Sequence, residues 1–387
     1  MSSVSQASQP HSSDLSITKH FTKLKDPRRR HRRLHHLQDI IVIALCAVIA
    51  GAQDWQDIET FGRQRRDWLQ RFLALPHGIP SHDTFERVFD RLKPQAFQAC
   101  FRHWVQAVSA ALRIKHVAID GKTLRGSGSA KLGSLHLVSA WATAQHLSLG
   151  QVAVDAKSNE ITAIPALLEL LDLHGALVTI DAMGCQKAIA QKIVDQGGDY
   201  ALTVKDNQPH LLADIQLRFA EAFDTDFAGL EHDTWHKRER GHGREEYRCY
   251  TVLHTTEGIR QAEDWAKLTT IGMCTSERTV QGKTTTEVRY FIGSRKVSAK
   301  FYGQGLRQHW GIENNLHWQL DVTFGEDRNR VSKRHAAENL ALLRRHTLTL
   351  VKAHPATLSI AKKRFAAALN PTFLEEILRG DGMMEKR

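Results

Sequence analysis

Hydrophobic and polar positions follow different periods in successive parts of this 387-residue chain. Residues 38–113 carry apolar positions at helical spacing, in DIIVIALCAVIAGA, QDIETFGRQRRDWLQRFLAL and SHDTFERVFDRL, which predicts a helical N-terminal domain. The apolar run from Ile40 to Ala52 is too short to cross a bilayer and is typical of a buried helix. Two helices around the turn PHGIPS resemble a helix-turn-helix, but αα-hairpins are so common that this pattern alone is weak evidence for DNA binding.

From His116 onward, short apolar runs with β-branched residues predict strands. HVAID, LHLVSAWATAQH and SLGQVAVD are expected to form the first three, and a tight turn makes the third antiparallel to the second. A helix in NEITAIPALLELLDL, the strand ALVTID, a helix at about 185–196 and the strand YALTVK follow. The order β-β-β-α-β-α-β predicts an α/β fold in which residues 114–206 form a mixed five-stranded sheet with flanking helices.

Residues 207–300 are predicted to form a β-rich insertion that follows a helix in DNQPHLLADIQLRFAEAF. Its strands are expected in EEYRCYTVLHT, LTTIGMCTS and TTTEVRYFIGS. His232, His236 and the HGRE motif have spacings that suggest a metal site, but a chain with 22 histidines produces such spacings by chance. Residues 301–387 turn helical again, beginning with GLRQHWGIENNLHWQLDVTFGEDRNR.

The formal net charge of +11 favours a polyanionic partner, and nucleic acid is the leading candidate. Residues 1–37 are predicted to be a disordered basic arm, because the Ser-rich start is followed by a dense cationic run. Five of its arginines are expected to bind phosphates: Arg28, Arg29, Arg30, Arg32 and Arg33. No secretory signal opens the chain, and five scattered cysteines fit reduced thiols in a cytoplasm.

Two aspartates end two of the predicted strands. Asp120 closes HVAID and Asp181 closes ALVTID, so the two carboxylates are expected to meet beyond the strand ends. A loop in which Asp120 pairs with Lys122 or Arg125 is the simpler alternative for either motif taken alone. The GKT sequence after Asp120 is not a P-loop, since His116 occupies the position where the motif requires glycine.

Adjacent carboxylates repel unless a divalent cation lies between them, which favours a phosphatase or nuclease. Glu313 is the candidate for a third ligand, because on a helix it shares a face with Leu306, Trp310, His317 and Leu320. A pairing of Glu313 with Arg307 or His317 is the structural alternative. Its rivals as ligand are Asp321, Glu326 and Asp327, of which the last two are expected on a turn after Gly325.

Long motifs in a fixed order give the chain a resemblance that covers nearly its whole length. They are AIDGKTLRG, KSNEITAIPALLELLDL, TIDAMGCQ, GGDYALTVKDNQ, GHGRE and HWGIENNLHWQLDVTFGEDRNR. Together they resemble the ISAs1 family of bacterial insertion-sequence transposases, also called H-repeat-associated proteins. The resemblance implies a DDE transposase with an RNase H-like catalytic domain, in which Asp120, Asp181 and Glu313 bind Mg²⁺ or Mn²⁺. The chain departs from the broader IS4-like group, since Leu306, His309 and Leu320 replace its signature Tyr, Arg and Lys.

These features predict metal-dependent cleavage and transfer of DNA strands at the ends of an insertion sequence. The expected partner is double-stranded DNA, as terminal inverted repeats and target DNA, bound by a homodimer at the nucleoid and not at a membrane. Phosphate contacts outside the arm are expected from Lys122, Arg125, Lys205, Arg307 and His317. An inactive relative that binds DNA without cutting it is the second hypothesis, and a metal-dependent phosphatase is the third.

Overall fold

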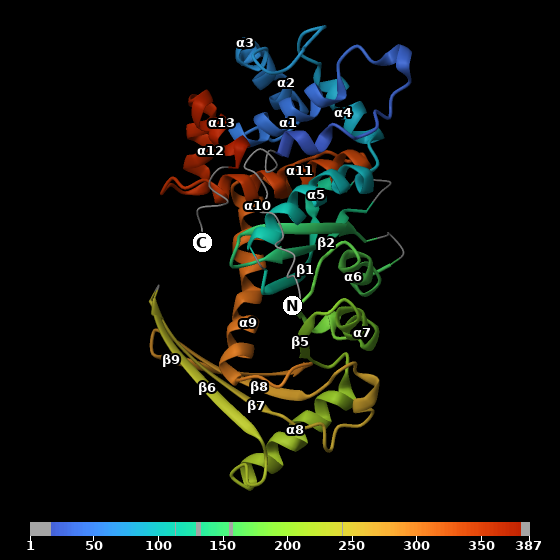
Figure 1. Ribbon diagram of the computed structural model, residues 1–387. Coiled ribbons are helices and arrows are strands. Elements are labelled where there is room, and N and C mark those ends of the chain that lie inside the picture. The colour runs from blue at the N-terminus through green and yellow to red at the C-terminus, as the bar shows by residue number, and fades with distance from the viewer. Residues whose placement is uncertain (1–16, 113, 129–132, 155–157, 242, 381–387) are drawn as a thin grey trace, which may run out of the picture.

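The computed structural model describes residues 17–112, 114–128, 133–154, 158–241 and 243–380, and a single mixed sheet runs through its centre. Nine strands follow one another in the order β3-β2-β1-β4-β5-β9-β8-β7-β6. Figure 1 shows the N-terminal helices together with α12 and α13 at one end of the molecule and β6–β9 at the other. The first five strands lie between these two ends.

The predicted α/β class and its mixed sheet are confirmed. β1 pairs antiparallel with β2 and parallel with β4, while β3 lies antiparallel to β2 and β5 parallel to β4. The bounds are β1 His116–Leu124, β2 Leu135–Ala142, β3 Leu147–Ala153, α6 Glu160–Leu168, β4 Leu177–Ile180, α7 Lys187–Asp195 and β5 Asp199–Val204. This is the strand arrangement expected of an RNase H-like sheet.

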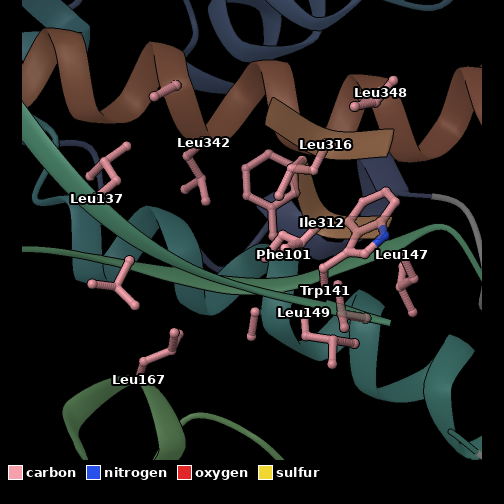
Figure 2. Close-up of a cluster of buried hydrophobic side chains, with 14 of the residues drawn as sticks. Phe101, Leu137, Trp141, Leu147, Leu149, Leu167, Ile312, Leu316, Leu342 and Leu348 are labelled. Carbon is pink, nitrogen blue, oxygen red and sulfur yellow. The ribbon is translucent and has the colours of Figure 1, made fainter. Parts of the chain in front are cut away.

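Apolar side chains on both faces of these strands form the core. Figure 2 shows Leu342 and Leu348 of α11 on one side of the strands and Leu167 of α6 on the other. All three leucines are buried, as is Trp141 of β2. The sheet is therefore covered on both faces, as parallel pairing of β1, β4 and β5 requires.

Asp120 does not end its strand, which corrects the sequence-based expectation. β1 continues to Leu124 because β2 pairs with it as far as Leu124 and Leu135. The parallel partner β4 stops earlier, at Ile180. Asp120 thus lies where the parallel neighbour ends, while its own strand continues along β2.

The insertion extends the central sheet, because β9 pairs antiparallel with β5. Its elements are α8 Pro209–Asp224, β6 His232–Gly241, β7 Arg244–Leu253, β8 Thr270–Val280 and β9 Lys283–Gly293. β7, β8 and β9 correspond to the three predicted strands, whereas β6 was not predicted. Its sequence HDTWHKRERG is polar on both faces and lacks the apolar alternation by which a half-buried strand is recognised.

The N-terminal domain surrounds one buried helix. Its helices are α1 Leu37–Ala50, α2 Trp55–Gln64, α3 Arg66–Leu69, α4 His82–Arg91 and α5 Pro94–Leu112. Buried arginines of the C-terminal helices bind the chain near the end of α1, where Arg364 donates to the carbonyl of Val48 and Arg344 to that of Gln53. These bonds tie the end of α1 and the loop after it to the C-terminal helices. The helices that supply and follow these arginines are α11 Arg334–Ala353, α12 Ile360–Leu369 and α13 Pro371–Arg379.

The prediction of a disordered arm is wrong for residues 17–37, while residues 1–16 lie outside the described part. Phe21 is 3% exposed and packs against the rings of Phe97 and Phe101. Arg28 is 7% exposed and forms an ion pair of 2.8 Å with Asp26. Short 3-10 turns at Ile17–Phe21 and Arg30–Arg32 complete the segment.

A long helical segment lies across the sheet on the face opposite α6. It consists of α9 Ala299–Ile312, the π-helical turn η7 Glu313–His317 and α10 Trp318–Val322. Glycines in α9 allow close contact, because a Cβ atom on Gly305 would lie 2.5 Å from Leu177 and one on Gly303 would lie 2.8 Å from Trp235 and Tyr250. Around Glu313 the α-helix expected from the sequence is replaced by a π-helical turn, a feature common at functional sites.

A buried ionic cluster joins β1 to the C-terminal helices. Glu326, in the 3-10 turn Glu326–Arg328, lies 3.0 Å from Nζ of Lys122 and 3.0 Å from Nη1 of Arg345. The side chains of Glu326 and Arg345 are both 0% exposed. Burial alone would raise the pKa of Glu326, but Arg345 and Lys122 hold it below its ordinary value.

Two expectations from the sequence concern membrane-spanning helices and disulfide bonds. Among the described residues no single helix has the length and hydropathy to cross a membrane, and α1 with α2 meets those criteria only as a pair bent by 96°. All five cysteines are thiols rather than disulfides.

We predict that Glu326→Gln lowers the free energy of unfolding by about 3–5 kcal/mol, because it leaves Arg345 as an uncompensated buried charge. The folded-state pKa of Glu326 is lowered, so its contribution is present above the unfolded pKa and lost as the pH falls through the folded one. Urea unfolding at neutral and acid pH measures both effects. Glu169→Gln, which breaks an exposed pair with Lys192, is the control and should cost less than about 1 kcal/mol. Equal stability of the two variants would contradict the prediction.

Candidate active site

Parallel pairing of β1 and β4 brings the two predicted catalytic aspartates together. Ile119 is paired with Ile180, and Asp120 and Asp181 are the next residues on their strands. Neighbouring strands lie about 4.8 Å apart, so the side chains of Asp120 and Asp181 lie next to each other on the same face of the sheet. Asp181 is further fixed as the cap of the turn Ala182–Gly184, where its Oδ1 accepts from the backbone N–H of Met183 at 3.2 Å.

Histidines occupy the space between these strands and the α9 segment. Oγ1 of Thr179 on β4 lies 2.9 Å from Nε2 of His116 and 3.1 Å from Nδ1 of His309. Burial lowers the pKa of His116 to about 3 and also lowers that of His309, so burial favours the neutral form of both rings. Nδ1 of His317 lies 3.4 Å from Oδ2 of Asp120.

The position of His317 corrects its predicted role in DNA contact. Its side chain is 11% exposed and lies beneath Asp120, so it is not presented to an external phosphate. No hydrogen bond to its Nε2 is found within the described residues. Its Nδ1 instead faces the Asp120 carboxylate.

Glu313 lies at the start of the π-helical turn and is exposed on the same side of the sheet. Partial burial raises the pKa of Glu313, and the negative charges of Asp120 and Asp181 raise it further. Glu313 therefore lies within electrostatic range of both aspartates. No cation lies within ion-pair distance of Glu313 among the described residues, so its predicted alternative pairing with Arg307 or His317 is not found.

The rivals of Glu313 are occupied elsewhere. Asp321 and Glu326 both bind Lys122, and Asp327 lies 3.7 Å from Lys122 and from Arg125. Lys122 is 9% exposed in this cluster, which corrects its predicted contact with DNA phosphates. The same cluster excludes the simple pairing of Asp120 with Lys122, because the lysine is held by acids of the C-terminal part.

Glu160 is a site residue that the sequence analysis missed. It is the first residue of α6 and its Oε1 lies 2.7 Å from Nε2 of His136. Burial raises the pKa of Glu160, and Asp181 and Asp120 add to the increase against the opposing effect of His136. A fourth carboxylate thus lies within electrostatic range of the two aspartates. The sequence signal for this residue is Gly121, since a glycine leaves the space that the Glu160 carboxylate fills.

A groove of about 680 Å³ opens beside the aspartates, between α9 and the strands of the insertion. Asp181, Glu313 and His309 form part of its wall. The groove is also lined by more cations than further acids. The further acids are Glu246, Glu277 and Glu287. The cations are Lys205, Arg244, Arg248, Arg278, Arg289 and Arg307. Two of the predicted DNA contacts, Lys205 and Arg307, therefore lie in the same groove as the candidate catalytic acids.

The remaining predicted cations divide into exposed and structural groups. Arg125 is 84% exposed, and Arg29 and Arg30 are exposed in the N-terminal segment. Arg28 is buried against Asp26, which corrects its predicted phosphate contact, while Arg33 donates to the carbonyls of Arg28 and Asp26 but keeps an exposed side chain, so its phosphate contact stays a prediction. The side chain of Arg32 lies outside the described part.

The donors fit a hard divalent cation in their chemistry. Asp120, Asp181, Glu160 and Glu313 offer only carboxylate oxygens, the ligands that Mg²⁺ and Mn²⁺ prefer. Among the described residues no three donor side chains are already close enough to hold one ion. Burial is the main cause of the raised pKa of both Glu160 and Glu313, and the charges of Asp120 and Asp181 add to it.

Comparisons with known proteins cover almost the whole chain. Residues 18–105 match a family described as "DDE_Tnp_1-associated" and residues 112–350 match one described as "Transposase DDE domain". "Putative transposase YncI" of Escherichia coli O157:H7 is 39% identical over 372 residues, 94% of each chain. "H repeat-associated putative transposase YhhI" of E. coli K12 is 38% identical over 378 residues, 95% of this chain and 98% of the relative. A cryo-EM structure of the piggyBac transposase synaptic complex with hairpin DNA aligns with a TM-score of 0.44 and 11% identity, covering 97% of this chain and 81% of the other.

We predict that Asp181→Asn lowers the pKa of both Glu160 and Glu313, because removing a nearby negative charge favours their ionised forms. Titration of ¹³C-labelled glutamate carboxyl groups by NMR measures the shift, with Glu160→Gln and Glu313→Gln used to assign the signals. Asp172→Asn removes an exposed acid that contributes to neither shift and is the control. Two unchanged glutamate pKa values in Asp181→Asn would show that the carboxylates are not clustered.

Proposed function

The chain belongs to the family of transposases with a DDE domain, and we propose that it cleaves and transfers DNA strands at the ends of an insertion sequence. The observation that supports the proposal is that Asp181 and Glu313 line a cation-rich groove, while the pairing of β1 with β4 places Asp120 beside Asp181. A groove of this kind suits a phosphodiester, because the acids would hold the cation and the surrounding cations would bind the flanking phosphates.

The roles follow from how each acid is held. Asp120, Asp181 and Glu313 would bind one or two Mg²⁺ or Mn²⁺ ions, which supply Lewis-acid activation of a water or 3′-hydroxyl and stabilise the leaving oxygen. His317 orients Asp120, and the turn after Asp181 fixes that carboxylate through backbone N–H groups. No covalent protein nucleophile is required.

The proposed DNA path combines the groove with the N-terminal segment. Lys205 and Arg307 line the groove beside the acids, and Arg125 is exposed near the end of β1. Neither Lys205 nor Arg125 is tightly paired, since Lys205 has no ion pair within the described residues and Arg125 lies 3.7 Å from Asp327. The DNA would be the terminal inverted repeats and the target, bound by two copies of the chain.

DNA binding without cleavage is the second candidate, because the basic groove alone would support it. The retention of all three acids, with Asp120 beside Asp181 and both aspartates within electrostatic range of Glu313, favours an active enzyme. Whether the wild-type protein cuts its own element's ends in Mg²⁺ separates the two candidates.

We predict that Asp120→Asn, Asp181→Asn and Glu313→Gln each slow Mg²⁺-dependent end cleavage by about 10³-fold or more, since a lost metal ligand removes several kcal/mol of transition-state stabilisation. Gel-shift affinity for the same duplex should persist. Cleavage of an end-containing duplex by purified variants, checked for folding by thermal melting, is the measurement.

Asp327→Asn is the matched control for this experiment, because it neutralises an acid of the same region that is 27% exposed. Glu326→Gln is unsuitable, since its buried ion pairs make it a stability variant. Asn variants that cut at the wild-type rate would mean that the site lies elsewhere, and a wild-type protein that binds the ends but never cuts them would support the inactive alternative.

We predict that the double variant Arg29→Ala, Arg30→Ala weakens binding to all duplexes and reduces the magnitude of the salt slope by up to about 2, near 0.9 for each lost phosphate contact. Binding measured over a range of salt concentrations tests this. Arg28→Ala is the contrasting variant, because its loss breaks the buried pair with Asp26 and should lower the melting temperature instead. A double variant with the wild-type salt slope would exclude this segment from the DNA interface.

A further inference from the structure

Glu160 approaches the aspartates from the opposite face of the sheet to α9. It begins α6, and its carboxylate lies under Gly121, the residue after Asp120. A Cβ atom on Gly121 would lie 2.1 Å from Oε1 and 2.4 Å from Cδ of Glu160. The carboxylate therefore occupies the space where any other residue at this position would place its side chain.

The end of β4 allows this carboxylate to reach the aspartates. β4 stops at Ile180, and the turn Ala182–Gly184 that Asp181 caps packs against Ile164 of α6, the helix that Glu160 begins. The electrostatic influence of both Asp181 and Asp120 on Glu160 agrees with this placement. Helix α6 thus adds an acid to the site that α9 covers from the other face.

Two residues of the neighbouring strands hold Glu160 in place. Nε2 of His136 lies 2.7 Å from Oε1 of Glu160, and Nδ1 of His136 lies 2.7 Å from Oγ1 of Thr123. Thr123 and His136 are directly opposite each other in the pairing of β1 and β2. If the Thr123 hydroxyl donates to Nδ1, the proton of the neutral ring is on Nε2 and is donated to Glu160. Such a partner behind a carboxylate is characteristic of metal ligands.

We propose that Glu160 is a fourth carboxylate of the metal site and that His136, supported by Thr123, is its positioning residue. The inference rests on the proposed function, since it concerns the same metal site. Two observations support it: the Glu160 carboxylate lies under Gly121, next to Asp120 in the chain, and it contacts Nε2 of His136 at 2.7 Å. The simpler reading, an ion pair that only secures the start of α6, predicts no effect on metal binding.

Binding of Mn²⁺ to the purified full-length chain, followed by EPR in the absence of DNA, distinguishes these readings. Wild type, Asp120→Asn, Glu160→Gln and the control Glu169→Gln are compared. Glu169 follows the same helix, is exposed and pairs with Lys192, so its loss tests the chemistry of the substitution away from the site. We expect Glu160→Gln to weaken Mn²⁺ binding about tenfold or more, with Glu169→Gln unchanged.

The outcomes separate this inference from the proposed function. Weakened binding in Asp120→Asn together with wild-type binding in Glu160→Gln overturns the role of Glu160 and leaves the three-acid site standing. Wild-type binding in Asp120→Asn overturns the metal site itself. The rise in melting temperature on adding Mn²⁺ is recorded for each variant, so a less stable variant still reports its metal affinity.

His136 is tested by two substitutions that differ in one property. His136→Phe keeps a ring but cannot donate to Glu160, and we expect it to weaken Mn²⁺ binding about as much as Glu160→Gln does. His136→Gln retains an N–H donor and should recover most of the affinity. Equal Mn²⁺ affinity of both variants and the wild type would remove the positioning role.

Discussion

Repulsion between two carboxylates held side by side is the constraint on which the active-site region depends. The parallel pairing of β1 and β4 places Asp120 next to Asp181, and Glu313 and Glu160 approach from opposite faces of the sheet. Folding the chain without a cation therefore costs electrostatic free energy at this point. Among the described residues, no lysine or arginine lies within ion-pair distance of these four acids, and two of them, Asp120 and Glu160, contact histidines instead.

Lys122, the cation nearest to Asp120 along β1, does not pair with that aspartate. Lys122 follows Asp120 by two residues and lies on the same face of β1, yet it binds Asp321 and Glu326. The lysine thereby joins the catalytic strand to the C-terminal segment and leaves Asp120 to His317. The negative charge of the site is preserved while the strand that carries it is anchored.

The same C-terminal segment connects the catalytic sheet with the N-terminal helices. Arg345 of α11 binds Glu326, and its neighbour Arg344 donates to the carbonyl of Gln53 after α1. The N-terminal segment is fastened in turn by Phe21 against α5. Exposed Arg29 and Arg30 are thus carried on an anchored framework, so a DNA-contacting segment would keep a defined position relative to the groove.

Local patterns predicted what depends on local order. Apolar runs predicted the buried helix α1 and the first five strands, and the ends of these runs pointed to Asp120 and Asp181. β6 was missed because HDTWHKRERG is polar apart from Trp235, and the π-helical turn at Glu313 because ENNLH fits an α-helix equally well.

Residues whose roles depend on distant partners could not be assigned from the sequence. Lys122 and Arg28 look like surface cations until Glu326 and Asp26 are placed against them. The Glu160 carboxylate can lie beside Asp120 only because Gly121 has no side chain and because β4 ends early, at Ile180. The sheet register and the burial of charges, which decide these roles, are properties of the folded chain.

Anomalous scattering from a crystal of the full-length protein soaked in Mn²⁺ tests the central claim most directly. The account predicts a peak between the carboxylates of Asp120 and Asp181, bound also by Glu313, and its loss in Asp120→Asn. A strong peak elsewhere, such as at His232 and His236, with none at the two aspartates would contradict it.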